Sequence, residues 1–233
     1  MSLAEDVAER VAQVRTRIAG AGGDGRAVAL VAVTKGFGPE VVGAALGAGV
    51  VDVAESYAQE LVAKAAALPA AVHVPSPRWH FVGRLQSNKV ARVASLVELW
   101  QSVDRIELIG HLARRAPSAR VLVQVDLTGA SGRGGCTPSE VAPLVAEARR
   151  GGLEVSGLMA VGPPGPPEGS RAGFRLLASL ADDLGLVERS MGMSADLEVA
   201  VEEGSTMVRV GRALFGPRTV RNRSGHAASG VRN

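Results

Sequence analysis

A lysine that follows a long apolar run is the residue of this sequence best placed for covalent chemistry. Lys35 comes directly after the apolar run 27–33 and Thr34, so its side chain should emerge at the end of a buried strand. Burial disfavours the charged form of an amine, and a neutral amine can attack an aldehyde. From position alone the alternative stays open that Lys35 only extends its charge from the strand end into water.

The segment 208–213 could bind a phosphate. Gly211 follows an apolar strand, and the backbone amides of Gly211 and Arg212 at the next helical turn can bind an anion. The last strands of α/β barrels often hold phosphate groups, and Ser194 can add a hydroxyl from the preceding strand. A lysine on the first strand opposite such a phosphate site matches a phosphorylated aldehyde.

The elements that must position these residues alternate between strands and helices. The apolar patterns predict strands at 27–33, 50–56, 79–83, 99–103, 120–127, 153–161, 187–193 and 206–210. They predict helices at 3–18, 39–48, 57–68, from about 88, and at 105–115, 138–150, 171–184 and 195–202, with a short turn at 213–215.

Eight such units predict a single (β/α)8 barrel with an extra N-terminal helix, since 233 residues suit one barrel domain. The proline-rich stretch 162–169 is interpreted as one loop of this barrel rather than as a domain linker. We expect the barrel to occupy residues 1–216 and a basic, disordered tail to occupy 217–233.

The charge pattern argues against nucleic acid as a partner. The formal charge is +3, but it becomes −1 without Arg218, Arg221, Arg223 and Arg232 of the tail. The single cysteine, Cys136, cannot form an internal disulfide and is expected to be inert. With no apolar signal segment and no run long enough to cross a bilayer, we expect a cytoplasmic protein that does not bind membranes.

Seven separated motifs resemble those of one known family, the pyridoxal phosphate homeostasis proteins. The similarity runs from about residue 4 to 216. The motifs are AVTK at 32–35, ESY at 55–57 with QE at 59–60, WHFVG at 79–83, LQSNK at 85–89, GLMA at 157–160, SMGMSAD at 190–196 and VRVGRALFG at 208–216.

The resemblance implies a barrel like the N-terminal domain of bacterial alanine racemase, which binds pyridoxal 5'-phosphate as a Schiff base on Lys35. It further implies a phosphate contact from Ser194 and from the backbone of Gly211 and Arg212. It implies that Arg209 faces the pyridine nitrogen. A permanent positive charge there disfavours protonation of the ring, which suits cofactor storage better than transamination. The remaining implied cofactor contacts come from Met159 and Ser56.

Three positions depart from the family pattern. Ser56 stands where an asparagine is usual and reaches less far, which puts its contact with the cofactor ring in doubt. Arg212 stands where a small residue such as threonine is frequent, so a hydroxyl contact to phosphate is lost unless the guanidinium replaces it. Arg133 stands where a lysine is common and keeps the charge.

The resemblance implies a non-catalytic carrier that supplies the cofactor, with apo-enzymes that depend on it as possible partners. The alternative is an amino-acid racemase that uses the Schiff base on Lys35. Racemases of this fold add a C-terminal domain and a second base, whereas this sequence stops soon after the eighth strand. Its one tyrosine, Tyr57, is expected to pack or to make a structural hydrogen bond. We therefore expect a monomer that is not an enzyme.

Two other kinds of site are disfavoured. A class I aldolase would commonly place its lysine late in the barrel, near the sixth strand, rather than on the first. The histidines, His73, His80, His111 and His226, include no pair at metal-ligand spacing. His80 lies inside the third strand and is interpreted as a core or supporting residue.

Overall fold

Eight parallel strands close into a barrel, each hydrogen-bonded to the next in chain order and the last to the first. The computed structural model describes residues 2–22, 28–68, 75–129 and 133–217. The strands are β1 Ala29–Val33, β2 Asp52–Glu55, β3 Arg78–Phe81, β4 Val97–Val103, β5 Arg120–Val125, β6 Glu154–Ala160, β7 Glu188–Ser190 and β8 Met207–Val210. The predicted (β/α)8 barrel is confirmed.

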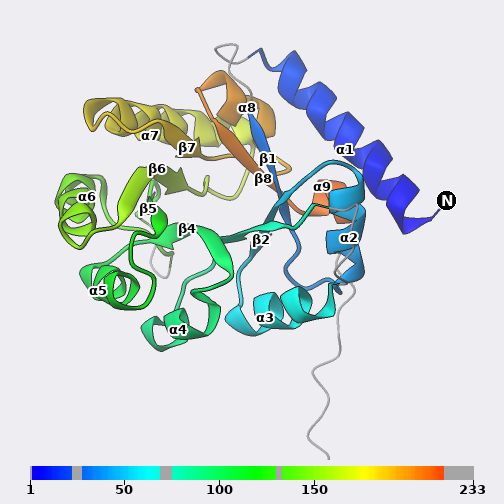
Figure 1. Ribbon diagram of the computed structural model, residues 1–233. Helices are drawn as coiled ribbons and strands as arrows, with labels where there is room; N and C mark the ends of the chain where they lie inside the picture. Colours follow the sequence, from blue (N-terminus) through cyan, green and yellow to red (C-terminus); the bar gives the residue numbers. More distant parts are fainter. Residues whose placement is uncertain (1, 23–27, 69–74, 130–132, 218–233) are drawn as a thin grey trace, which may run out of the picture.

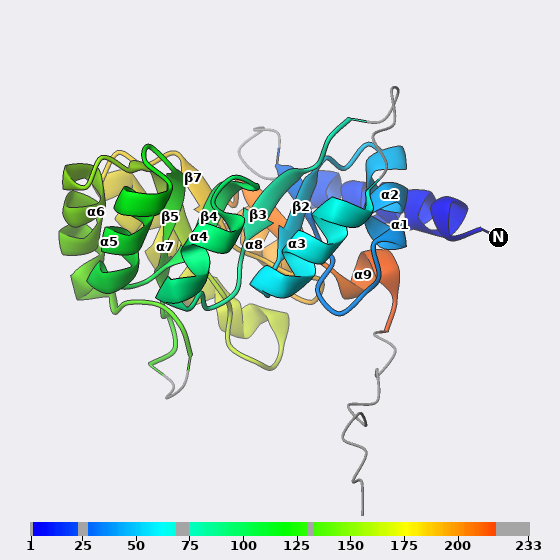
Figure 2. The ribbon, with the colours of Figure 1, turned by 60° about the horizontal axis from the view of Figure 1, so that its bottom comes forward.

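Helices surround the barrel (Figure 1). They are α1 Leu3–Gly20, α2 Glu40–Gly47, α3 Ala58–Ala67, α4 Val90–Val93, α5 Ile106–Arg115, α6 Val141–Arg150, α7 Arg171–Asp183, α8 Leu197–Glu202 and α9 Arg212–Phe215. Short 3-10 turns precede three of them, η1 Ser87–Lys89, η2 Pro138–Glu140 and η3 Pro167–Ser170. Figure 2 shows α3 and α4 side by side on the outside of the barrel, where they contact each other. No helix among the described residues is long and apolar enough to cross a membrane.

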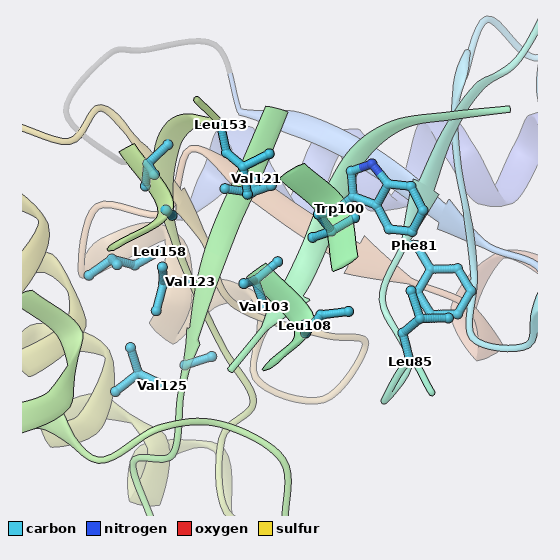
Figure 3. Close-up of a cluster of buried hydrophobic side chains, with 14 of the residues drawn as sticks. Phe81, Leu85, Trp100, Val103, Leu108, Val121, Val123, Val125, Leu153 and Leu158 are labelled. Carbon is cyan, nitrogen blue, oxygen red and sulfur yellow. The ribbon is translucent and has the colours of Figure 1, made fainter. Parts of the chain in front are cut away.

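The outer core lies between the strands and the helices. Figure 3 shows Phe81 and Trp100 of neighbouring strands beside Leu85, with Val121 and Val123 of β5 further along. The two rings lie 6.1 Å apart between centroids. Apolar side chains of β1, β2, β4, β5, β6 and β8 lie both in the outer clusters and in the barrel interior, which explains the continuous apolar runs at these strands.

A smaller apolar cluster fills the barrel interior. Its members are buried side chains from strands on all sides: Val31, Val33, Ala54, Leu99, Leu122, Met159 and Met207. The barrel is thus packed rather than hollow, and the polar groups inside it must find hydrogen-bond partners there.

The extra N-terminal helix lies against the outside of the barrel. Val7, Val11 and Val14 of α1 are buried, and the helix contacts α2, α8 and α9 (Figure 1). It starts with a capping box, in which Ser2 and Glu5 each bind the other's backbone amide. α1 ends at Gly20, two residues beyond the predicted span 3–18.

The structure differs from the predicted elements mainly at their ends. β5 stops at Val125 rather than 127, because the Asp126 carboxylate accepts a hydrogen bond from the Thr128 amide in a turn. β7 covers only Glu188–Ser190, a shorter span than the predicted 187–193. The stretch 162–169 is one βα loop, as predicted, and it includes the start of η3. The predicted tail lies outside the described residues from 218 onward.

Candidate functional site

The ends of three neighbouring strands bring the predicted residues around Lys35 together. Lys35 follows β1 by two residues, and Val33 lies opposite Ala54 of β2. On the other side Ala32 lies opposite Val210 of β8. Lys35 is therefore placed between the end of β2, where Ser56 follows, and the end of β8, where Gly211 follows.

Two side chains of α3 bind the peptide groups on either side of Lys35. Lys64 Nζ donates a hydrogen bond of 2.6 Å to the carbonyl oxygen of Thr34. The amide of Gly36 donates one of 2.8 Å to Glu60 Oε2. The backbone at Lys35 is thereby fixed from the outside of the barrel, while its own side chain is only half-buried.

Lys64 also forms an ion pair with Glu55, the last residue of β2. Lys64 is 4% exposed and Glu55 is fully buried, and Lys64 Nζ donates a hydrogen bond to Glu55 Oε1. The hydroxyl of Thr34 donates to the same oxygen at 2.7 Å. Burial raises the pKa of the Glu55 carboxyl, and the hydrogen bonds from Lys64 and Thr34 oppose that shift.

Sequence reasoning missed Lys64, because a lysine in the middle of an amphipathic helix looks like a solvated residue. Its only signal is a spacing of nine residues from Glu55 and four from Glu60, whose carboxylate lies 3.6 Å from Lys64 Nζ. We name Thr34, Glu55, Glu60 and Lys64 the lysine-side cluster.

The sequence contains three lysines, so few amines can bind an aldehyde. Lys64 is held in the buried ion pair. Lys89 ends the turn η1, which follows β3 rather than β1. Of the three, Lys35 is the one that leaves a buried strand beside the ends of β2 and β8, as the sequence predicted.

Arg209 of β8 lies inside the barrel and is 5% exposed. Its guanidinium donates hydrogen bonds of 2.7 Å to Ser190 Oγ and of 2.7 Å to the carbonyl oxygen of Ala160. Burial lowers the pKa of Arg209 to about 10, which still leaves the side chain charged at neutral pH. Met159, 1% exposed, lies in the interior cluster one residue before Ala160.

The predicted phosphate-binding residues meet at α9. Ser194 Oγ accepts a hydrogen bond of 3.3 Å from the amide of Ala213, so the hydroxyl lies at the first turn of the helix. A side chain at Gly211 would put its Cβ 3.0 Å from the carbonyl oxygen of Val33. Glycine therefore lets the end of β8 lie close to the end of β1. Arg212 is exposed and begins α9.

Ser56 lies against the next strand end. Its amide is 3.3 Å from Glu55 Oε2, and a Cβ on Gly83 would come within 2.1 Å of its carbonyl oxygen. The end of β3 can reach this close only because residue 83 is glycine.

The other residues considered from the sequence have mixed outcomes. Tyr57 is not packed in the core: it is the N-cap residue of α3 and is 59% exposed. His80 is a buried supporting residue, as predicted. Burial raises the pKa of the Cys136 thiol to about 12, which agrees with an inert cysteine. Arg133 donates a hydrogen bond of 3.0 Å to the carbonyl oxygen of Gly162.

Two pockets lie at opposite ends of the barrel. One of about 210 Å³ is at the C-terminal ends of β5 and β6 and is lined by Gln124, Asp126 and Arg133 among others. A larger one of about 860 Å³ is at the N-terminal end of the strands, lined in part by Asp52 and Arg78. The larger pocket is remote from Lys35, so size alone does not indicate the site of chemistry.

The fold and the placement of Lys35 define a class of α/β barrels with a lysine at the end of the first strand, and three comparisons identify the family. The family model "Alanine racemase, N-terminal domain" matches residues 5–219. Proteins named "Pyridoxal phosphate homeostasis protein" from Pseudomonas aeruginosa and Deinococcus radiodurans are 38% and 40% identical. The matches cover 93% and 88% of this chain and 96% and 97% of those proteins. The chain belongs to this family of pyridoxal phosphate homeostasis proteins.

Solved structures agree with this assignment. PipY of Synechococcus elongatus, solved without pyridoxal phosphate, has a TM-score of 0.80 at 31% identity, with 90% of this chain and 100% of that chain covered. PipY has also been solved with pyridoxal phosphate bound, with a TM-score of 0.75 at 30% identity. An alanine racemase from Clostridium difficile shares the fold at 14% identity, with a TM-score of 0.66 over 87% of this chain and 58% of its own.

Proposed function

We propose that this protein binds pyridoxal 5'-phosphate as a Schiff base on Lys35 and takes part in intracellular homeostasis of that cofactor, without catalysing a reaction. The observation that carries the proposal is the position of Lys35. Its flanking peptides are bound by Lys64 and Glu60, and its strand ends beside Gly211. The names of the relatives and the cofactor bound to PipY support the same reading.

The residues around Lys35 fit this cofactor. The amine of Lys35 matches the aldehyde, and the buried guanidinium of Arg209 matches the pyridine nitrogen. The hydroxyl of Ser194 and the strand end at Gly211, which has no side chain, match the phosphate. In this proposal Lys35 binds the aldehyde carbon, and Ser194 with the backbone of Gly211 and Arg212 binds the phosphate. The pyridine nitrogen faces Arg209, while Met159 and Ser56 line the ring.

The bound cofactor supplies an electron-accepting ring to any amine attached to it. The charge of Arg209 limits that capacity, because a guanidinium beside the ring nitrogen disfavours its protonation. Exposure of Tyr57 at the surface also favours a carrier over a racemase, since a second base must be held against the reacting carbon.

Further parts of the proposal concern the surroundings of the protein. We infer a cytoplasmic monomer that passes pyridoxal phosphate to apo-enzymes dependent on it. We also infer a barrel domain at 1–216 followed by a separate basic tail at 217–233.

Absorption spectroscopy tests the proposal. Purified protein incubated with pyridoxal phosphate should show an imine band, and Lys35→Ala should lose it while the control Lys89→Ala keeps it. Borohydride reduction followed by peptide mass mapping should place the label on Lys35. An imine band that persists in Lys35→Ala would contradict the assignment of the lysine.

The same samples separate carrier from enzyme. D- and L-alanine are added to the loaded protein, and the enantiomer ratio is followed by chiral chromatography. No interconversion is expected. Racemisation that depends on both Lys35 and Tyr57 would instead make the protein a racemase.

A further inference from the structure

A row of buried polar side chains crosses the barrel interior from Arg209. Arg209 lies 2.7 Å from Ser190 Oγ, which lies 2.7 Å from Gln101 Oε1. The other end of the same amide, Gln101 Nε2, lies 2.6 Å from His80 Nδ1. Gln101 and Ser190 are fully buried, and His80 is 3% exposed, so these groups have to satisfy one another.

The row continues to the opposite end of the barrel. His80 Nε2 lies 3.2 Å from Asp52 Oδ1. Asp52 accepts two further hydrogen bonds, of 2.8 and 2.7 Å, from Arg78. Asp52 and Arg78 begin β2 and β3 and line the pocket at the N-terminal ends of the strands. We name the residues Arg209, Ser190, Gln101, His80 and Asp52 the interior chain.

The two ends of the interior chain impose one direction on its hydrogen bonds. A guanidinium can only donate and a carboxylate can only accept. Ser190 must therefore accept from Arg209 and donate onward to the Gln101 oxygen. The Gln101 amide nitrogen then donates to His80, so His80 Nδ1 is an acceptor and the ring hydrogen is on Nε2, facing Asp52.

The remaining donor of the Gln101 amide agrees with this direction. Gln101 Nε2 also lies 3.1 Å from the sulfur of Met207, a weak acceptor. With the amide turned over, its oxygen would face the sulfur and His80 Nδ1, and its nitrogen would face Ser190, whose hydrogen would lose its acceptor. Every donor in the interior chain thus has an acceptor in one arrangement only.

We propose that Ser190, Gln101 and His80 are positioning residues that orient the Arg209 guanidinium toward the ring of bound pyridoxal phosphate, with His80 acting as the neutral Nε2–H tautomer. The cofactor part of this inference rests on the proposed function. The direction of the interior chain is a property of the protein without cofactor.

The physical reason is that a buried guanidinium needs fixed acceptors on more than one side. Arg209 has one in the carbonyl of Ala160 and another in Ser190. Ser190 in turn keeps a lone pair fixed along that line because its own hydrogen is directed at Gln101. Removing the Gln101 acceptor frees the hydroxyl to rotate, and the guanidinium loses its fixed partner.

Two substitutions at Gln101 distinguish this role from simple packing. Gln101→Glu keeps an acceptor for Ser190, whereas Gln101→Met fills similar space without one. Packing alone favours Met, because a buried carboxylate is costly. If the hydrogen bonds of the interior chain matter, Glu is the better replacement, because the new carboxylate accepts from Ser190 on one side and from a doubly protonated His80 on the other.

Titration with pyridoxal phosphate, followed by the imine band, measures the first consequence. We expect Gln101→Glu to bind within about threefold of the unmodified protein and Gln101→Met to bind about tenfold more weakly, as for one lost charge-assisted hydrogen bond. Equal weakening by both variants, or none by Gln101→Met, would overturn the positioning role.

Two serines provide a matched pair for the same titration. Ser190→Ala should also weaken binding about tenfold. Ser156→Ala removes a buried hydroxyl that has no hydrogen-bond partner among the described residues, and it should leave binding unchanged. Equal effects of the two changes would contradict the inference even if Gln101→Met fails to fold.

Nitrogen-15 NMR of histidine-labelled protein without cofactor measures the direction of the interior chain. His80→Gln assigns the His80 signals among the four histidines. We expect the Nε2–H tautomer in the unmodified protein and a doubly protonated ring in Gln101→Glu at the same pH. An Nδ1–H tautomer in the unmodified protein would overturn the inference. Failure of the proposed function would look different, with the expected tautomer but no imine band.

Discussion

The two sides of the barrel mouth support their key residues in different ways. Beside Lys35, the outer helix α3 supplies a charged side chain, Lys64, that reaches the strand ends and pairs with Glu55. Beside Arg209, the strands alone supply the interior chain, whose middle members are uncharged. One side fixes a backbone from outside the barrel, and the other fixes a side chain from inside it.

The difference shows which kind of support suits Lys35 and which suits Arg209. The proposed Schiff base needs an amine at a fixed place, and the lysine-side cluster binds the Thr34 and Gly36 peptides around Lys35. The ring contact needs a guanidinium plane at a fixed angle, which single directed hydrogen bonds provide. Loss of either partner of a buried ion pair costs much unfolding free energy, whereas loss of one partner of a neutral hydrogen bond costs less.

Lys64→Met should have the largest effect on stability. The change leaves the fully buried Glu55 without its cation, which costs roughly 3–5 kcal/mol of unfolding free energy. Urea denaturation followed by circular dichroism measures it, with Lys89→Met as a control that should change little. Adding Glu55→Gln to Lys64→Met should restore part of the loss. A single variant as stable as the unmodified protein would remove the distinction between the two sides.

Gln101→Met should destabilise the protein less than Lys64→Met. It leaves the Ser190 hydroxyl and a His80 ring nitrogen without partners, at a cost of about 1–3 kcal/mol. The same urea experiment compares the two variants directly. If Gln101→Met proves the more damaging, the interior chain is the main structural support, and the contrast drawn above is reversed.

The sequence predicted the barrel because its signals are local. The run that ends at Val33, two residues before Lys35, is apolar on both faces, and the alternation of such runs with helical patterns repeats eight times along the chain. Lys35, Arg209 and Gly211 could be singled out because each lies next to a recognisable strand end.

The supporting residues could not be predicted because their partners are far apart in sequence. Gln101 and Ser190 are separated by 89 positions, and nothing in the neighbourhood of either residue marks it as polar interior rather than surface. Lys64 has the same local pattern as an exposed helical lysine. Tyr57 was expected to pack or to make a structural hydrogen bond and is instead 59% exposed, since the residue that precedes a helix can point away from the barrel.

Gly211→Ala tests the junction between the two sides, where β8 meets β1. The added Cβ would lie 3.0 Å from the Val33 carbonyl oxygen, so the strand ends must move apart by a few tenths of an ångström. We expect a loss of about 1–2 kcal/mol and weaker binding of pyridoxal phosphate in the imine titration.

A matched glycine supplies the control. Gly43 in α2 has nothing within 4 Å of an added Cβ, so Gly43→Ala should stabilise the protein by about 0.5–1 kcal/mol. If both glycine changes are stabilising, close approach at Gly211 does not matter for the fold.

Arg78→Ala should have the smallest effect, because it removes only the exposed partner of Asp52, the last member of the interior chain. Burial acts to raise the pKa of Asp52, but the hydrogen bonds from His80 and Arg78 outweigh it and hold that pKa below its usual value. Such a carboxylate stabilises the folded state above its unfolded pKa of about 3.9, and this stabilisation is lost as the pH falls through the lower folded value.

Because the Arg78 side chain is 56% exposed, its pair with Asp52 should contribute only about 0.2–1 kcal/mol at neutral pH. The effect of Arg78→Ala should be clearer at acid pH. The change lets the pKa of Asp52 rise, so the loss of stability moves to higher pH. Thermal unfolding between pH 3 and 7 measures this shift, with the exposed Arg92→Ala as control. If the variant loses stability over the same acid pH range as the unmodified protein, His80 alone stabilises the charged form of Asp52. The interior chain would then be anchored entirely from within the barrel.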